Sequence, residues 1–120
     1  MLDINETSCL KKIVEEKDFL EMAKNADILL APYHGREAGF CKEFVEIVNP
    51  RVTVISDSRY RKETSKGDWY ADNSRGWKVH DKDGKSIFDG KTLSTYYYGT
   101  IFVSFGYNDS DKRFMHIRTS

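Results

Sequence analysis

The chain has 120 residues, with nineteen basic and nineteen acidic side chains that cancel to a formal net charge of zero. This length suits a single domain over residues 1–120 with one core. The charge balance gives no global argument for binding nucleic acid or an anionic membrane, although a local basic patch stays open. No apolar run approaches the roughly 20 residues that span a bilayer, and residues 1–18 lack a signal-peptide pattern, so we expect a cytoplasmic protein.

Residues 27–57 contain the clearest structural pattern. The apolar runs over 28–30 and 52–55 predict two short strands that are covered on both faces. Between them, the spacing of apolar residues predicts a helix over 38–48, which Asn49 and Pro50 end. Two such strands joined by a helix predict a parallel pair with a right-handed crossover.

The flanking regions carry further elements. An apolar stripe over 6–24 predicts one bent helix or two short ones. Ser65 precedes a short predicted helix over 66–73 that buries Trp69, with Tyr70 as a further candidate for burial. The last third alternates in the manner of antiparallel strands. Strands are predicted over 77–80, 87–88, 93–98, 100–105 and 114–117, with Asp-Gly turns at 81–84 and 89–90. The widely spaced Cys9 and Cys41 favour two buried thiols over a disulfide. The predicted fold class is α/β, or α+β with a mixed sheet: a parallel βαβ core followed by antiparallel hairpins.

The order of these parts resembles the C-terminal half of metallo-β-lactamase-fold hydrolases of the competence-protein ComEC type. In that family an Asp-Ile/Val-Leu strand runs into a His-His-Gly loop, then a helix, a Pro-Lys/Arg-x-x-Val-Ile-Ser strand and a closing Asp-Gly-x-Ile strand. The matching segments here are 27–35, 50–56 and 98–103, within a resemblance that covers roughly 20–105. It implies half of an αββα sandwich, zinc as the family's metal, and a phosphodiester or nucleic-acid substrate.

Two features depart from the family pattern. The sequence contains three histidines and no His-x-His-x-Asp-His metal cluster, which in the family belongs to the N-terminal half. The paired histidine of the family loop is Tyr33-His34 here. The resemblance therefore implies a hydrolase part that is not competent alone and that binds no zinc by itself. The alternative is a non-catalytic remnant or protein-interaction module that keeps the half-fold.

His34 is the first candidate metal ligand, because it follows a strand at the carboxyl end, where open α/β sheets place ligands. Asp3 is the second, since the family often carries a bridging carboxylate about thirty residues before the loop. The plainer interpretations are an ordinary loop histidine and a solvated residue near the chain terminus.

Three residues are candidates for binding substrate: Arg36, Asp57 and Arg59. Arg36 at a helix entry suits an anionic group, and the basic loop after Asp57 suits a nucleic-acid backbone. The alternatives are a polar helix entry and a solvated loop.

The resemblance also bears on assembly. If this chain is half of a sandwich, its helices cover only one face of the sheet, and the other face stays apolar and exposed. We therefore expect a homodimer or a complex with a complementary N-terminal-half chain, formed through that face.

Overall fold

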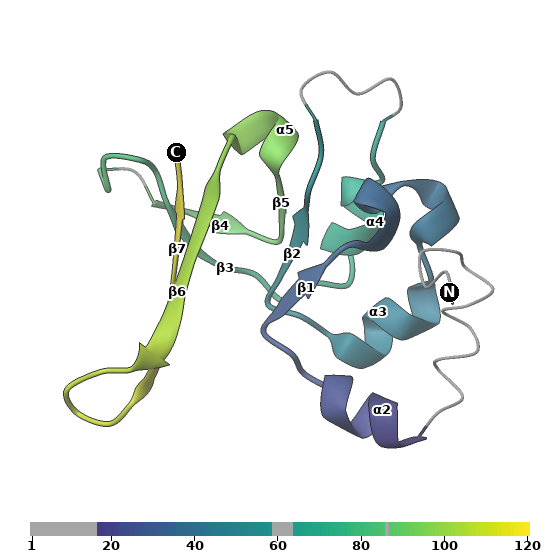
Figure 1. The fold of residues 1–120 in the computed structure, drawn as a ribbon, viewed down its shortest axis with the longest axis horizontal. Helices are drawn as coiled ribbons and strands as arrows, with labels where there is room; N and C mark the ends of the chain where they lie inside the picture. Colours follow the sequence, from purple (N-terminus) through teal and green to yellow (C-terminus); the bar gives the residue numbers. More distant parts are fainter. Residues whose placement is uncertain (1–16, 59–63, 86) are drawn as a thin grey trace.

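The computed structural model describes residues 17–58, 64–85 and 87–120, which form two β-sheets and the short helices around them (Figure 1). The first sheet contains β1 (Ile28–Leu30), β2 (Val52–Ile55) and β5 (Thr92–Ser94), in the order β1-β2-β5. Ile28 lies opposite Val52, and Thr53 lies opposite Thr92, with all neighbouring strands parallel. The predicted parallel pairing of 28–30 with 52–55 is confirmed.

Helices cover one face of this sheet (Figure 1). They are α3 (Lys42–Val48) and α4 (Gly67–Ala71), while α2 (Lys17–Ala23) packs against α3, where the Phe19 and Phe44 rings stack. Phe44 and Val48 of α3 pack with Cys41 and Leu29, while Val45 packs with Ile55 and Tyr70. Cys41 is a buried free thiol, as expected, whereas Cys9 and the part of the predicted helix before residue 17 lie outside the described residues.

The segment before α3 differs from the predicted helix over 38–48. It forms two 3-10 turns, η1 (Pro32–Gly35) and η2 (Glu37–Gly39), and the α-helix begins only at Lys42. Phe40 and Cys41 are extended, which separates the turns from the helix. The helix ends as predicted, because Asn49 adopts a left-handed conformation before Pro50.

The second sheet contains β3 (Trp77–His80), β4 (Ile87–Gly90), β6 (Ile101–Tyr107) and β7 (Arg113–Thr119). Its order is β4-β3-β7-β6, with antiparallel hairpins β3–β4 and β6–β7 joined by a parallel contact between β3 and β7. The two hairpins agree with the predicted antiparallel strands. The fold is therefore α+β, with a parallel core followed by hairpins.

Two details of the last third were predicted wrongly. Asp89 and Gly90 do not turn the chain but pair with β3. The predicted antiparallel strand over 93–98 is instead β5 of the parallel sheet followed by helix α5 (Thr95–Tyr98), which Ser94 caps by accepting a hydrogen bond from the Tyr96 amide. After β4 the chain leaves the second sheet and joins the first as β5. This path places the Leu93 side chain between the two sheets, where it is fully buried.

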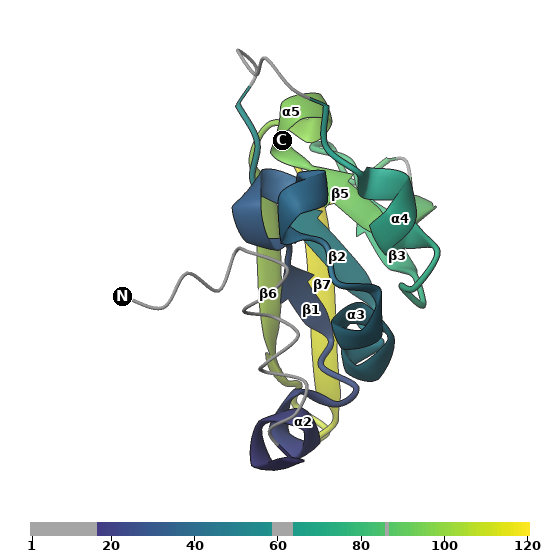
Figure 2. The same ribbon diagram turned by 90° about the vertical axis from the view of Figure 1, so that its right-hand side faces the viewer.

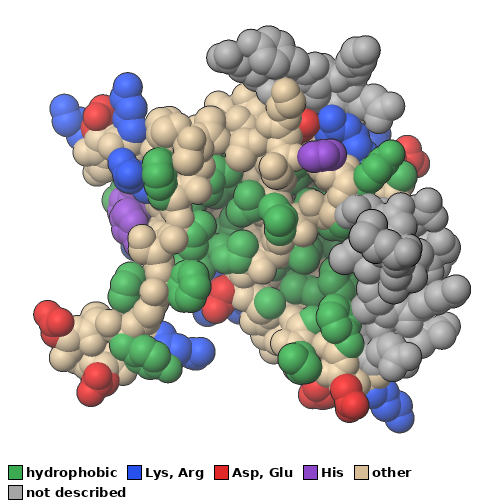
Figure 3. Space-filling model, viewed as in Figure 1, with side chains coloured by type: hydrophobic (Ala, Val, Ile, Leu, Met, Phe, Trp, Pro, Cys, Tyr) green, Lys and Arg blue, Asp and Glu red, His purple; other side chains and the backbone are tan. Residues whose placement is uncertain are grey.

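The second sheet packs against the face of the first sheet that the helices leave open (Figure 2). Val52 and Leu93 contribute from one side, and Val79 and Ile117 contribute from the other. The expectation that this face stays bare is thus wrong over β2 and β5. Over β1 it holds in part, since Leu30 is 64% exposed and hydrophobic side chains gather in the hollow between the two sheets (Figure 3).

Candidate functional site

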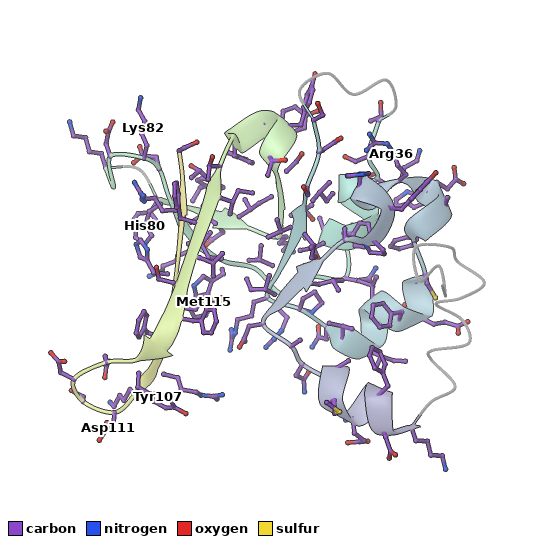
Figure 4. All side chains as sticks on the ribbon, in the orientation of Figure 1. Arg36, His80, Lys82, Tyr107, Asp111 and Met115 are labelled. Carbon is purple, nitrogen blue, oxygen red and sulfur yellow. The ribbon has the colours of Figure 1, made fainter. Side chains whose placement is uncertain are left out.

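The candidate residues that can be placed lie at the carboxyl end of the parallel sheet. His34 follows β1, Asp57 follows β2 and Thr95 follows β5. Parallel strands bring their carboxyl ends to one edge, and the register of β1 with β2 does so here. Figure 4 shows Arg36 at this end of the sheet.

The backbone of the loop after β1 is unusual. Tyr33, His34 and Gly35 all have positive φ angles, of 53°, 53° and 70°. A bulky residue such as Tyr33 rarely adopts this conformation, which costs on the order of 1–3 kcal/mol. Gly35 is also required by space, since a Cβ there would lie 2.9 Å from Ile55 Cδ1. The loop is therefore held in a conformation that its sequence does not favour.

His34 has a defined tautomer in this loop. Its Nδ1 lies 2.7 Å from the carbonyl oxygen of Ser56. Because a carbonyl oxygen only accepts, Nδ1 carries the proton and donates it to Ser56. In the neutral ring, Nε2 then carries the lone pair that can bind a metal or accept a proton.

Arg36 and Asp57 form an ion pair beneath this histidine. Arg36 Nη2 donates to Asp57 Oδ1 at 3.0 Å and Nη1 donates to Oδ2 at 3.2 Å, so both carboxylate oxygens are engaged. The side chains are 14% and 2% exposed. Nη1 also donates to the carbonyl oxygen of His34 at 2.8 Å. The pair ties the loop after β1 to the end of β2 and thereby positions His34.

Thr95 is a contributor that the sequence did not reveal. Its Oγ1 accepts a hydrogen bond from the Asp57 amide and donates one to the Asp57 carbonyl oxygen, both at 2.7 Å. It was missed because 93–98 was predicted as an antiparallel strand. The signal that could have found it is Ser94, a typical cap residue directly before three tyrosines.

Two candidate residues cannot be placed, and the other two histidines lie in the second sheet. Asp3 and Arg59 lie outside the described residues. His80 and His116 stack on each other in the second sheet, with ring centroids 4.4 Å apart, and His80 lies on the opposite side of the molecule from Arg36 (Figure 4). Among residues 17–58, 64–85 and 87–120, no three His, Cys, Asp or Glu side chains are grouped so as to hold a metal.

Two depressions open near the carboxyl edge. One is shallow and is lined by Tyr33, Arg36, Glu37, Ala38, Thr64 and Lys66. The other lies between α4 and β4–β5 and includes Asp68, Lys91, Ser94 and Tyr97. None of the helices formed by the described residues has the length and apolar character needed to cross a bilayer.

Family models, curated proteins and solved structures were compared with the chain, and none of them matched. The resemblance to metallo-β-lactamase-fold hydrolases therefore stays a prediction that rests on the residues quoted for it.

Proposed function

We propose that this chain is the C-terminal part of a metallo-β-lactamase-fold, ComEC-like hydrolase of the phosphodiester or nucleic-acid class. In this proposal the chain contributes His34 as one metal ligand and is not competent for hydrolysis alone. The parallel β1–β2 pair and the placement of the His34 loop at its carboxyl end agree with the family's order of parts.

The observation that carries the proposal is the way the His34 loop is held. Strained backbone persists only where surrounding contacts enforce it, and it clusters at functional sites. Here the Arg36–Asp57 pair and the bond from His34 to Ser56 enforce it. A metal-binding histidine almost always donates its second ring N–H to a carbonyl or carboxylate, and His34 does so.

A complete zinc site does not fit the described residues. Zinc hydrolases use about three protein ligands, and Asp57, the candidate carboxylate at the same edge, has both oxygens bonded to Arg36. In the family, zinc acidifies a bound water, and the proposal assigns the missing ligands, beyond the candidate Asp3, to another chain. Arg36 then acts as a positioning residue, and its direct contact with substrate stays a prediction, as do those of Asp57 and Arg59.

Zinc titration followed by nitrogen-15 NMR of the histidine rings tests the ligand role. We expect Nδ1-protonated His34, with a ring signal that shifts on adding millimolar zinc, and no such shift in His34→Ala. A ring protonated at Nε2, or one that does not respond to zinc, would refute the role. His116→Ala is the matched control, because His116 lies on β7, away from the site.

Elemental analysis and an assay on bis(p-nitrophenyl) phosphate test the second half of the proposal. The chain alone is expected to retain no stoichiometric zinc after dialysis and to hydrolyse nothing with added zinc or manganese. About one tightly held zinc per chain, lost in His34→Ala, would mean that the chain carries a full metal site. The proposal that the chain is not competent alone would then be wrong.

A second candidate function is a non-catalytic interaction module. It is favoured by the apolar side chains that stay exposed on several strands, among them Leu30, Ile87, Phe102 and Phe105. Figure 3 also shows hydrophobic side chains gathered in the hollow between the two sheets, and a contiguous exposed apolar surface marks an interaction site. Activity that never appears with any complementing chain, together with a stable protein complex, would favour this candidate.

A further inference from the structure

The free edge of β6 is the longest unpaired strand edge in the described part of the chain. β6 spans seven residues and pairs only with β7, whereas β1 and β5 span three each and β4 spans four. Proteins normally protect such an edge with lysine, proline, a bulge or a covering element. The sequence IFVSFGY has no charge and no proline, and its register with β7 is continuous. β6 is thus an open template for another strand.

The backbone groups that face this edge can be identified. The Ser120 amide donates to the Thr100 carbonyl oxygen, and the Asn108 amide donates to the Lys112 carbonyl oxygen. Both bonds lie on the β6–β7 register, so the even-numbered residues of β6 bond to β7. The odd-numbered residues, which begin at Ile101 and end at Tyr107, therefore point their N–H and C=O groups away from the sheet.

We propose that β6 pairs antiparallel with β6 of a second copy of this chain, around a two-fold axis through Ser104. This register uses the whole strand and places Ile101 opposite Tyr107 and Val103 opposite Phe105. All four are residues whose backbone groups face outward, so about eight hydrogen bonds close the pair. The two four-stranded sheets then become one continuous sheet.

The side chains are complementary in this register. A two-fold axis perpendicular to the sheet keeps each face on the same side. Phe105 and Tyr107, which are 79% and 70% exposed, then pack beside Val103 and Ile101 of the second copy. On the other face, Phe102 lies opposite Gly106, and an aromatic ring beside an edge glycine stabilises strand pairing. Figure 4 shows Tyr107 at the end of β6, near the turn into β7.

Charge does not oppose the pairing of two copies. The edge itself carries no charge that would need a partner of opposite sign. A two-fold arrangement also places Ser104 against Ser104, where two small hydroxyl side chains meet without repulsion. The contact is confined to one strand, so we expect a reversible dimer of modest affinity, on the order of micromolar.

Sedimentation across a dilution series tests the assembly. The chain of 13.9 kDa is expected to approach twice this mass as concentration rises. Ser104→Lys places two lysines directly opposite each other and should weaken association at least tenfold. The control is Ile87→Lys, which introduces a lysine at an exposed position on the opposite edge of the sheet and should leave the dimer intact. A wild-type monomer at high micromolar concentration would overturn the proposal, and so would a dimer that Ser104→Lys does not affect.

Disulfide formation tests the register independently of any folding defect. At a non-hydrogen-bonded antiparallel pair the Cα atoms lie about 4.5 Å apart, within the reach of a disulfide. Ser104→Cys should therefore form a covalent dimer under mild oxidation. Phe102→Cys should not, because its copies lie about 13 Å apart along the strands. The unsubstituted chain, which keeps Cys9 and Cys41, measures the background. Equal cross-linking of both variants would refute the register.

Discussion

Tyr70 allows a stability prediction whose sign and size follow from its surroundings. The side chain is fully buried, and its ring packs edge-on against Phe40 with centroids 5.0 Å apart. Its hydroxyl has no hydrogen-bond partner among the described residues. Burial, with a further contribution from Cys41, raises the pKa of Tyr70 from 10.0 to about 12. Tyr70→Phe removes the hydroxyl and keeps the ring.

Two effects determine the expected size. At neutral pH, a buried hydroxyl without a partner costs about 1–3 kcal/mol, so Tyr70→Phe should stabilise the fold by about 1 kcal/mol. At alkaline pH the unfolded chain loses its proton near pH 10, while the folded chain keeps it until about pH 12. The stability linked to this proton is fully present below pH 10 and is lost between pH 10 and about 12. Two pKa units correspond to about 3 kcal/mol.

Urea unfolding at pH 7, 9, 10.5 and 11.5 measures both effects. We expect Tyr70→Phe to be more stable than the wild type at pH 7, and the difference to grow above pH 10. Tyr97→Phe is the control, because Tyr97 is 70% exposed and should show neither effect. A loss of more than 1 kcal/mol at pH 7 would mean that the hydroxyl has a partner. Parallel pH profiles would mean that Tyr70 does not resist ionisation.

Two further substitutions test the site and the contact between the sheets. Asp57→Asn leaves the Arg36 guanidinium without its buried counter-ion and should lower the free energy of unfolding by about 2–3 kcal/mol. The control is Glu46→Gln, in an exposed pair with Lys42, which should change the free energy of unfolding by less than about 0.5 kcal/mol. If urea unfolding shows equal losses for the two variants, the Arg36–Asp57 pair does not hold the loop after β1 in place. Gly90→Ala would place a Cβ 2.8 Å from Val79 Cγ2 on the neighbouring strand and 3.2 Å from Leu93 Cδ2 of the other sheet, and should cost about 1–3 kcal/mol. Gly67→Ala, whose nearest contact is 3.5 Å, should be close to neutral. Thermal unfolding of the two alanine variants compares them, and an unaffected Gly90→Ala would show that the packing of Val79 and Leu93 around this position adjusts easily.

The sequence predicted the parallel core because its signals are local. The β-branched run over 52–55 and the stop at Asn49-Pro50 each depend on neighbouring residues only. Their consequence is the parallel β1–β2 pair, which brings His34 and Asp57 to one edge. The predicted location of the candidate site at this edge follows from the same signals.

Other features depend on contacts that are remote in sequence. The strand at Thr92–Ser94 joins β2 because Leu93 fills a space between two sheets, and periodicity does not reveal such a partner. The Arg36–Asp57 pair spans 21 residues, and without it the left-handed conformation of Tyr33 has no explanation. The sequence therefore identified His34 as a candidate but not the contacts that orient it.

The proposed complementing chain at the His34 edge and the proposed β6 dimer use different parts of the molecule, so experiments can separate them. Leu30 is exposed at the end of β1, directly before the loop that carries His34. A complementary chain that covers Leu30 would therefore also reach the carboxyl edge, where the proposed zinc site needs further ligands. Pairing through β6 uses a different sheet and leaves that edge open. If both occur, the β6 contact joins two copies, and each copy remains able to receive its own complementing chain. A self-association that buried Leu30 instead would compete with the complementing chain that the proposed zinc site requires.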